Sequence, residues 1–464
     1  MTALRETNRY QAYPEYKDSD VEWLDDIPKD WCTRRLKHML ESSMSYGANE
    51  AAERAVSTEP RYIRITDMNS DGTLKEDTFR SLPKDIASDY LLKDRDILLA
   101  RSGATVGKSF IYRKEFGDCC FAGYLIKVSC DSARLNSDYA FWFFQSSSYW
   151  QYISGSQIQA TIQNVSAEKY GEMYISLPEH VEEQTQIANF LDHETAKIDT
   201  LIEKQQQLIK LLKEKRQAVI SHAVTKGLNP QAPMKNSGVE WLGEVPEHWE
   251  QIKLKHITHQ IVDAEHKTAP YFDDGEYLVC RTTNVRDGKL RLDGGKYTNH
   301  AIYEEWTKRG QPEVGDILFT REAPAGEACV YTGEVPLCLG QRMVLFKLNQ
   351  TRVLPEFVLH SIYSGLADDF VKQLSQGSTV AHFNMSDIQN IPLFEPPKDE
   401  QAQIVDHLAK VLAKYDALTS SASLKIELMQ ERRTALISAA VTGKIDVRNW
   451  QAPISQEQAL EQTA

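Results

Sequence analysis

The sequence predicts a mixed α/β protein with two similar globular domains joined by two long antiparallel coiled-coil helices, related by a pseudo-two-fold internal repeat. Three observations support this. The chain repeats itself once over a period near 218 residues, the middle of each copy contains short strand-like runs, and each copy closes with a long helical pattern. A period this long indicates a duplicated pair of domains, because solenoid units run roughly 20 to 50 residues.

The repeat is clearest at the two ends of each copy. KDSDVEWLDDIP from Lys17 recurs as KNSGVEWLGEVP from Lys235, and EKRQAVISHAVT from Glu214 returns as ERRTALISAAVT from Glu431. The middles of the copies match only in scattered places. The copies therefore share a scaffold and differ in their central surfaces, a pattern that suits a protein that reads two different things.

These patterns divide the chain into seven segments. We expect an N-terminal arm (1–31), a first globular domain (32–177), a first long helix (178–229), a repeat of the arm (230–249), a second globular domain (250–394), a second long helix (395–445) and a flexible tail (446–464).

The middle segments carry short strand-like runs between Gly, Asp and Asn residues. Examples are Tyr62–Thr66, Asp96–Leu99 and Leu125–Val128, and Asp138–Phe144 is a helical stretch between such runs. Each middle segment is therefore expected to be a mixed α/β domain rather than an all-β sandwich.

The closing segments predict long helices. Glu182–Ala223 and Asp399–Ala440 contain no Pro or Gly, start with acidic residues and are followed by Gly227 and Gly443. Apolar residues fall at steps of three and four, which predicts a continuous seam on each helix; they are Leu191, Ile198, Leu201, Leu208, Leu212 and Val219 in the first, and Ile404, Leu408, Val411, Leu418 and Leu436 in the second. About 42 residues make a rod on the order of 60 Å long. Two such rods bury their seams most simply against each other; the alternative is that each packs on its own domain.

The composition is that of a water-soluble protein. The hydrophobic fraction is 41%, and no apolar run of about 18 residues suggests a membrane span. The N-terminus lacks the apolar stretch of a signal peptide, so we expect a cytoplasmic protein. The net charge of −13 is unfavourable for DNA binding, because DNA is itself negatively charged. Residues 32–176, however, contain equal numbers of basic and acidic residues, 18 Lys and Arg and 18 Asp and Glu. The second globular segment is mildly acidic, so the charge alone is neutral to slightly unfavourable for DNA binding.

The repeated motifs resemble those of type I restriction–modification specificity (S) subunits. The resemblance rests on YKDSDVEWLDDIPKDW and MKNSGVEWLGEVPEHW, and on the helical segments that start EEQTQIANFLDHETAKIDTL and DEQAQIVDHLAKVLAKYDAL. It covers almost the whole chain, and its motifs are long and occur twice.

The resemblance implies that each globular domain is a target-recognition domain for one half of a bipartite, asymmetric site in double-stranded DNA, with the coiled coil setting the spacing. It also implies two methyltransferase (M) subunits, which supply S-adenosylmethionine and adenine methylation, and restriction (R) subunits, which use ATP and Mg. We expect no cofactor and no metal on this chain itself.

Candidate DNA-binding residues in the first copy form two groups. Arg pairs with guanine and Gln with adenine through two parallel hydrogen bonds, so loops rich in these residues are the candidates. Arg101 follows a strand-like run, and Ser102, Thr105 and Lys108 come next in the chain. The alternative is a structural arginine paired with Asp94 or Asp96. The second group comprises Gln157, Gln159, Thr161 and Gln163, which share one side if their segment is extended.

The second copy offers equivalent candidates. Arg321 corresponds to Arg101, and Thr379, His382 and Asn384 lie in the stretch equivalent to the glutamine-rich segment; Asn384 is alternatively the start of a helix, because Ser386–Gln389 is a capping box. Gly123 recurs at Gly340, so Gln341 and Arg342 replace Tyr124 and Leu125. Gln341 and Arg342 are alternatively an exposed strand end.

The sequence offers no catalytic constellation. Gly103–Ser109 resembles a phosphate-binding loop but has three residues between its glycines where that loop has four. We therefore expect a non-catalytic subunit. The competing hypothesis is a coiled-coil scaffold with two protein-binding heads and no DNA role, which the acidic balance favours and the divergent polar loops oppose.

Overall fold

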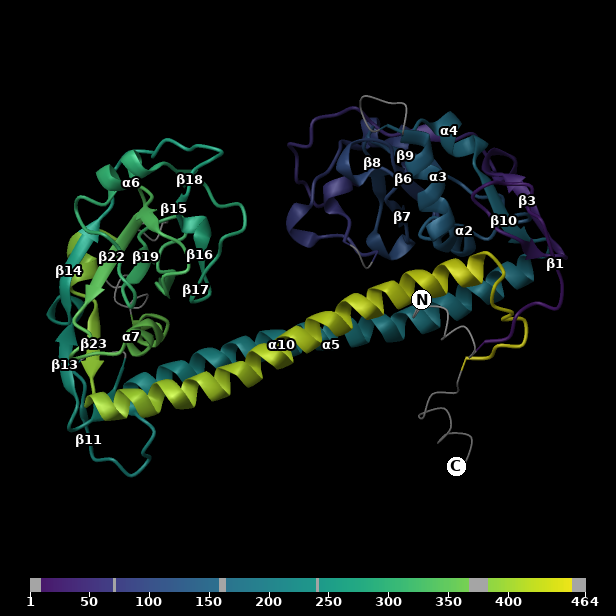
Figure 1. The fold of residues 1–464 in the computed structure, drawn as a ribbon. Coiled ribbons are helices and arrows are strands. Elements are labelled where there is room, and N and C mark those ends of the chain that lie inside the picture. Colours follow the sequence, from purple (N-terminus) through teal and green to yellow (C-terminus); the bar gives the residue numbers. More distant parts are fainter. Residues whose placement is uncertain (1–9, 70–71, 158–163, 239–241, 367–382, 453–464) are drawn as a thin grey trace, which may run out of the picture. The chain divides into compact units, whose positions relative to one another are not determined.

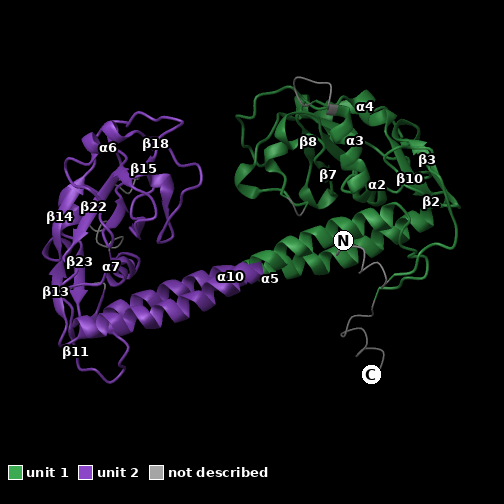
Figure 2. Ribbon diagram, in the orientation of Figure 1, with its two compact units in different colours: residues 1–206, 423–464 green, residues 207–422 purple. Residues whose placement is uncertain are grey.

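The computed structural model describes residues 10–69, 72–157, 164–238, 242–366 and 383–452. The chain forms two compact units, one of residues 1–206 and 423–464 and the other of residues 207–422 (Figure 2). Each unit contains one α/β domain and a segment of each long helix. The predicted mixed α/β class and the two-domain layout are therefore confirmed.

The domain of the first unit is built on a four-stranded sheet in the order β4-β9-β6-β7. Figure 1 labels β9, β6 and β7 of this sheet. All four residues of β6 are buried, because this apolar strand lies between two neighbours. Strands β5 and β8 pair in parallel, and β3 pairs with β10, which brings the start and the end of the domain together. The strands are β1 (Tyr16–Lys17), β2 (Ile27–Pro28), β3 (Trp31–Arg35), β4 (Ser45–Tyr46), β5 (Arg61–Ile63), β6 (Ile97–Ala100), β7 (Ser109–Ile111), β8 (Cys119–Phe121), β9 (Leu125–Val128) and β10 (Tyr174–Pro178), and the short helices are α1 (Lys84–Ala87), α2 (Ser137–Phe143), α3 (Ser147–Gln157) and α4 (Ala167–Glu172).

The domain of the second unit has a sheet of the same kind, in the order β14-β22-β19-β20. Strand β19 is fully buried like β6, β15 pairs in parallel with β21, and β13 pairs with β23. Its strands are β11 (Met234–Asn236), β12 (Glu244–Pro246), β13 (Glu250–Lys253), β14 (Thr258–Asp263), β15 (Tyr277–Cys280), β16 (Val285–Arg286), β17 (Lys289–Leu290), β18 (Tyr297–Thr298), β19 (Ile317–Thr320), β20 (Ala328–Val330), β21 (Leu337–Leu339), β22 (Met343–Leu348) and β23 (Pro392–Glu395), and its short helices are α6 (His300–Trp306), α7 (Pro355–Ile362) and α9 (Met385–Gln389).

The two long helices form as the sequence predicts. Helix α5 spans Val181–Lys226 and helix α10 spans Lys398–Val441. Acidic residues occupy the first turn of both helices, where they interact favourably with the helix dipole. Gly227 and Gly443 follow the helix ends with φ of +73°, a conformation that glycine adopts at little cost.

Segments of both helices pack into the core of each unit. In the first unit, Phe190 and Leu191 of α5 share a core with Ile437 and Val441 of α10. In the second unit, Ile220 and Val224 of α5 share a core with Ile404 and Leu408 of α10. Each domain therefore packs on the start of its own helix and on the end of the helix from the other copy.

The prediction of a continuous apolar seam is wrong at three positions. Leu201, Leu208 and Leu418 have exposed fractions of 47%, 42% and 54%. The cores of the two units cover only the segments near the helix ends, where residues such as Leu191 and Leu408 are fully buried. Spacing alone does not show which part of a long helix is covered.

Two buried tryptophans anchor the arms of the two copies. Trp31 donates a hydrogen bond from its indole N–H to Glu183 Oε1 at 3.0 Å, and Trp249 donates to Glu400 Oε2 at 3.1 Å. Both carboxylates lie in the first turn of a long helix. Each arm is thereby fixed to a helix start.

The start of the predicted flexible tail is ordered against the first unit. Val447 is buried, and the ring of Trp450 packs edge-on against Phe190, with ring centroids 5.5 Å apart. The expectation of flexibility is therefore wrong for residues 446–452, because apolar side chains of this segment cover the start of α5. Residues 453–464 lie outside the described residues.

In the described ranges, no helix combines the length and the hydropathy that a membrane span requires. The seven cysteines are free thiols. Burial raises the pKa of Cys119 and of Cys120 to about 12.

Candidate nucleic-acid interface

An open cavity of about 910 Å³ lies in the domain of the first unit. It is formed by the segment before β5, the turn after β5 and two loops that flank β7 and β9. Three basic side chains line it, Arg64, Lys75 and Lys108, together with the carboxylate of Glu50. Its other polar lining residues are Asn49, Thr66, Thr105, Tyr62 and Tyr124.

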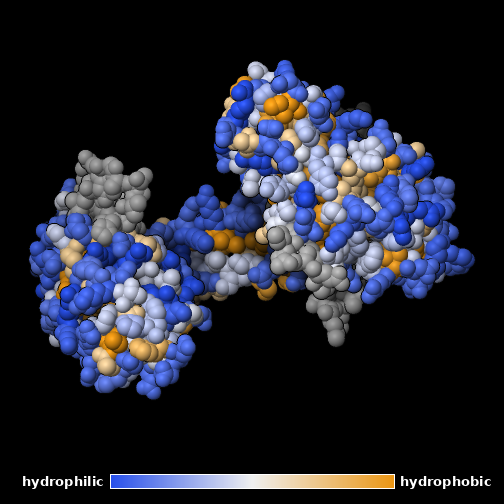
Figure 3. All heavy atoms as spheres, turned by 90° about the horizontal axis from the view of Figure 1, so that it is seen from above, coloured by the Kyte–Doolittle hydropathy of each residue, from blue (hydrophilic) through white to orange (hydrophobic). Residues whose placement is uncertain are grey.

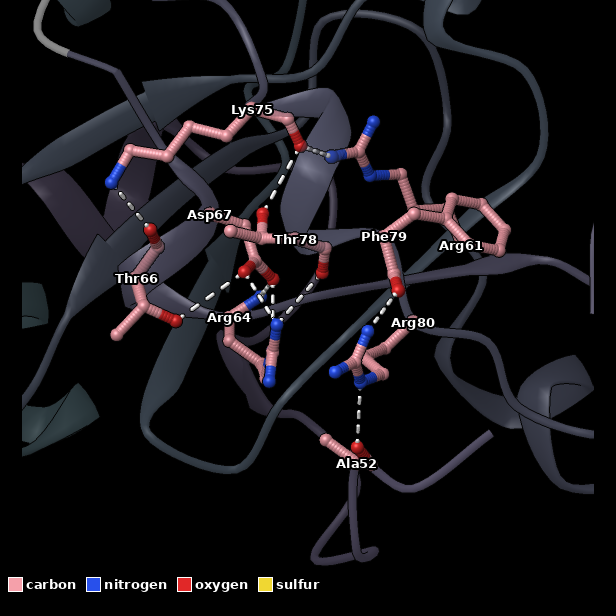
Figure 4. Close-up of polar contacts among 9 residues, drawn as sticks. All are labelled: Ala52, Arg61, Arg64, Thr66, Asp67, Lys75, Thr78, Phe79 and Arg80. Atoms are coloured by element: carbon pink, nitrogen blue, oxygen red, sulfur yellow. Dashed lines mark hydrogen bonds and ion pairs between the residues drawn. The ribbon is translucent and has the colours of Figure 1, made fainter. Parts of the chain in front are cut away.

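Arg64 is held in place by a buried carboxylate. Its Nε and Nη2 atoms donate to Asp67 at 3.0 and 2.7 Å, and Nη2 also donates to the carbonyl of Thr78 at 2.9 Å (Figure 4). Asp67 is 1% exposed and also accepts the backbone N–H of Arg64. The charge of Arg64 is therefore neutralised within the domain.

The two lysines of the cavity interact with neutral groups. Lys75 Nζ donates to the carbonyl of Thr66 at 3.0 Å (Figure 4), and Lys108 Nζ donates to the carbonyl of Met68 at 3.1 Å. Within the described part of the chain, neither lysine forms an ion pair with a carboxylate. Burial lowers the pKa of Lys108, and the nearby charge of Lys75 lowers it further. Two uncompensated positive charges side by side favour an anionic ligand such as a phosphate.

The predicted loop after β6 contributes to this surface. Thr105 and Lys108 line the cavity, whereas Ser102 forms a β-bridge with Asn164 beside it. The guanidinium of Arg101 lies over the ring of Tyr46, 4.6 Å from the ring centroid. The structure brings these four predicted residues into one region of the domain.

The alternative pairing of Arg101 with an aspartate is not seen. Asp96 accepts hydrogen bonds from the backbone N–H of Lys93 and from Ser129 Oγ, and Asp94 accepts the backbone N–H of Lys114. Both aspartates therefore stabilise turns.

The glutamine-rich segment is described only at its first residue. Gln157 is the last residue of α3, so its backbone is helical and not extended as the alternation predicted. Helix α3 starts at Ser147 and continues through Gly155 to this residue. Gln159, Thr161 and Gln163 lie outside the described residues.

In the second unit, Arg321 occupies the position equivalent to Arg101 and has a carboxylate partner. Its Nη1 atom lies 3.1 Å from both carboxylate oxygens of Asp263, and its side chain is 15% exposed. Arg321 is thus a neutralised, largely buried arginine.

The strand register corrects the predicted equivalence of the two glycines. The N–H of Ala122 donates to the carbonyl of Ile63, and the N–H of Gly340 donates to the equivalent carbonyl of Cys280. Gly340 therefore corresponds to Ala122. The backbone N–H of Arg101 likewise donates to Tyr124, as that of Arg321 donates to Arg342.

It follows that Gln341 replaces Gly123 and Arg342 replaces Tyr124. The prediction from the sequence is one residue out of register, because it rests on matching glycines and not on strand pairing. Gln341 accepts a hydrogen bond from Thr268 Oγ1 at 3.2 Å, and Arg342 pairs with Glu322 at 3.1 Å. Both residues are exposed.

The remaining predicted residues of the second unit are partly described. Asn384 is the N-cap of α9, and its side chain accepts the backbone N–H of Asp387 at 2.9 Å, so it starts a helix as the alternative expected. The capping box joins Asn384 with Asp387, and not Ser386 with Gln389 as predicted. Thr379 and His382 lie outside the described residues.

The sequence does not predict that Arg64, Lys75 and Tyr124 line the cavity. The parallel pairing of β5 with β8 brings the turn after β5 close to the loops of the main sheet, and no linear pattern reveals that pairing. One signal was present, since an arginine follows the equivalent strand in both copies, at Arg64 and Arg281.

Two α/β domains share one topology, and among the described residues the cavity of the first domain carries two lysines without a carboxylate partner, which suits an anionic ligand. Comparison with known proteins agrees. The family described as type I restriction modification DNA specificity domain matches residues 28–211 and 246–428.

Individual relatives agree with this family match. The type I restriction enzyme MjaVIII specificity subunit of Methanocaldococcus jannaschii is 24% identical over 378 residues, which cover 78% of this chain and 81% of the relative. The StySPI specificity subunit of Salmonella potsdam is 22% identical over 455 residues, covering 92% and 91%. A chain in a solved structure of the type I R-M system shares the fold, with a TM-score of 0.69 at 14% identity over 90% of this chain and 99% of that one.

The chain belongs to the type I restriction–modification DNA specificity family, and its role is DNA sequence specificity. The competing hypothesis of a scaffold without a DNA role is not supported.

Proposed function

We propose that each domain reads one half of a bipartite, asymmetric DNA site. The observation that carries this proposal is that equivalent positions of one shared frame hold different side chains, such as Tyr124 in the first domain and Arg342 in the second. A conserved frame with divergent exposed positions suits two readers of different sequences. The uncompensated charges of Lys75 and Lys108 would contact DNA phosphates, which position a protein on the duplex but carry no sequence information.

The predicted DNA-binding residues keep their roles as part of this proposal. In the first domain they are Arg101, Ser102, Thr105, Lys108 and the glutamine-rich segment that starts at Gln157. In the second they are Gln341, Arg342, Thr379, His382 and Asn384, together with Arg321, which forms an ion pair with Asp263.

The two long helices would pair along their length as an antiparallel coiled coil that sets the distance between the half-sites. Support comes from each unit separately. Arg433 pairs with Asp199 at 2.9 Å in the first unit, and Arg216 pairs with Asp416 at 3.2 Å in the second. In both units the end of one helix meets the start of the other, which is the relation that a pseudo-two-fold axis produces.

The partners would be two methyltransferase subunits and the restriction subunits of the same enzyme. Exposed apolar residues on the helices supply a surface for the methyltransferase subunits, and Figure 3 shows hydrophobic patches on the helical segments. These residues include Leu201, Leu208, Leu211, Leu418, Leu424 and Leu428. The chain itself would be non-catalytic and cytoplasmic, with S-adenosylmethionine, ATP and Mg bound by the partner subunits.

A methylation map tests this proposal. A host that expresses this chain with its methyltransferase subunit is compared with the same host lacking this chain. We expect methyladenine at one bipartite motif, present only with the chain. A confirmed complex with an active methyltransferase that marks no motif would contradict the proposal.

A further inference from the structure

Two arginine positions recur in both domains, each directly after an equivalent strand. Arg64 follows β5 and Arg281 follows β15, and both precede a short helical turn whose third residue accepts their backbone N–H. Arg101 follows β6 and Arg321 follows β19. The four arginines therefore form two equivalent pairs, Arg64 with Arg281 and Arg101 with Arg321.

In the first domain, a carboxylate neutralises Arg64 but not Arg101. Asp67 forms two hydrogen bonds with Arg64. Arg101 lies over Tyr46, whose hydroxyl accepts the backbone N–H of Ala167 at 3.0 Å. Among the residues that the structure describes, no carboxylate pairs with Arg101.

In the second domain, the arrangement is reversed. Asp263 neutralises Arg321, the second arginine. The residue equivalent to Asp67 is the neutral Asn284, whose side-chain oxygen accepts the N–H of Arg281 and whose amide donates to Arg291. Arg281 donates from Nη2 to the carbonyl of Gly294 at 3.1 Å, and in the described ranges it has no carboxylate partner.

Strand register shows that the two domains carry the neutralising carboxylate at different positions of the shared frame. Tyr46 pairs with Ile126 in β9, and Asp263 pairs with Val344 in β22. Ile126 and Val344 both follow the residue opposite the last residue of the central strand, so Tyr46 and Asp263 are equivalent. Each domain thus keeps one neutralised arginine and leaves one uncompensated, but at different positions.

An uncompensated guanidinium in a partly buried setting is costly unless a ligand supplies acceptors. Guanine offers two acceptors, N7 and O6, at the spacing of two parallel guanidinium donors. Contact with the ring of Tyr46 restrains the guanidinium of Arg101, which favours such directional pairing over a diffuse phosphate contact.

We propose that Arg101 in the first domain and Arg281 in the second each contact a guanine, and that Arg64 and Arg321 position the surrounding turns. The inference rests on the proposed function. It assigns sequence reading to a different member of the repeated arginine pair in each domain.

The test uses the complex of this chain with its methyltransferase subunit. Binding is measured on DNA that carries the mapped motif, and on a panel in which each base pair of the motif is replaced in turn. Arg101→Ala should abolish discrimination at one G·C pair of one half-site, a loss between about 5-fold and 150-fold, and Arg281→Ala should do so in the other half-site. Arg134→Ala, which removes an arginine paired with Asp131, is the matched control and should leave the profile unchanged.

A second variant series acts without removing the arginine. Tyr46→Asp places a carboxylate where the second domain has Asp263, and it should reproduce the loss seen with Arg101→Ala. Tyr46→Phe keeps the ring and should retain discrimination, and Arg101→Lys should lose it because a lysine cannot form two parallel hydrogen bonds. Thermal unfolding of each complex shows that the variants are folded.

The outcomes separate the two proposals. A wild-type complex that prefers no motif overturns the proposed function and this inference with it. A wild-type preference that survives unchanged in folded Arg101→Ala and Arg281→Ala complexes overturns the inference alone. So does a half-site without any G·C pair, or an Arg101→Lys complex with full discrimination.

Discussion

Lys75 and Lys108 place two positive charges on the cavity of the first domain, and their hydrogen bonds go to backbone carbonyls. A lysine that contacts a phosphate releases a counterion, so its removal lowers the salt dependence of binding. We expect Lys75→Ala and Lys108→Ala each to weaken binding on all sequences and to reduce the slope of log K against log salt by about 1. DNA titrations of the complex at several salt concentrations measure this slope.

The control for the lysine variants is Lys29→Ala, because Lys29 is paired with Glu15 on an exposed surface of the same unit. It should leave the slope unchanged. Equal slopes for wild type and both cavity variants would show that these lysines do not contact the DNA backbone.

His360 on α7 gives the second unit a pH-dependent stability. Burial, and next the positive charge of Arg216, lower its pKa from 6.5 to about 4. The unfolded chain therefore binds the proton more readily than the folded one. The contribution to stability is complete above pH 6.5 and is lost as the pH falls toward 4, by at most about 3 kcal/mol.

We expect His360→Gln to show a smaller loss of unfolding free energy than wild type between pH 7 and pH 4.5. Urea unfolding at both pH values measures it, and His256→Gln in the same unit is the control. An identical loss in wild type and His360→Gln would rule out His360 as the titrating group.

At the residue scale, the sequence predicts the types of residue at the site better than it predicts the register of the strands. It groups Thr105 and Lys108 with Arg101, because they are close in the chain, and their contact with DNA stays a prediction. It misses Arg64 and Lys75, which reach the cavity only through strand pairing. The one-residue error at Gly340 has the same origin, since hydrogen-bond register is a tertiary property.

At the scale of elements, the two helix ends offer a matched comparison. Gly227 and Gly443 share a φ of +73°, so alanine at either position costs roughly 1–2 kcal/mol of backbone strain. A Cβ on Gly443 would clash with the ring of Pro28, whereas a Cβ on Gly227 would meet Glu400 Oε1 at 3.2 Å and Trp249 at 3.3 Å.

Gly443→Ala should therefore destabilise the protein more than Gly227→Ala, by an additional 1–3 kcal/mol or so, because the proline ring cannot move aside without the arm. Chemical denaturation of both variants measures the difference in unfolding free energy. A larger loss for Gly227→Ala would contradict this account of how the arms cover the helix ends.

The long helices are the elements that the sequence predicts best, within a few residues at each end, because acidic starts and glycine stops are local signals. Their burial is predicted less well. Leu201 and Leu418 fit the seam by spacing but are exposed, since coverage depends on where each domain packs.

At the scale of the whole molecule, the defining feature is the duplicated domain. The internal repeat is visible in the sequence, and it predicts two domains of one topology, which the sheet orders bear out. Which half of a DNA site each domain reads cannot be predicted from the sequence, because the pairing of side chains with bases depends on loop geometry.

The most direct test of the central claim, that each domain reads one half-site, is a methylation map of a chain in which residues 32–177 are replaced by a second copy of residues 250–394. If each domain is an independent reader on a pseudo-two-fold frame, the map of the assembled complex should show an inverted repeat of one half of the wild-type motif. Persistence of the complete asymmetric wild-type motif in that complex would contradict the claim.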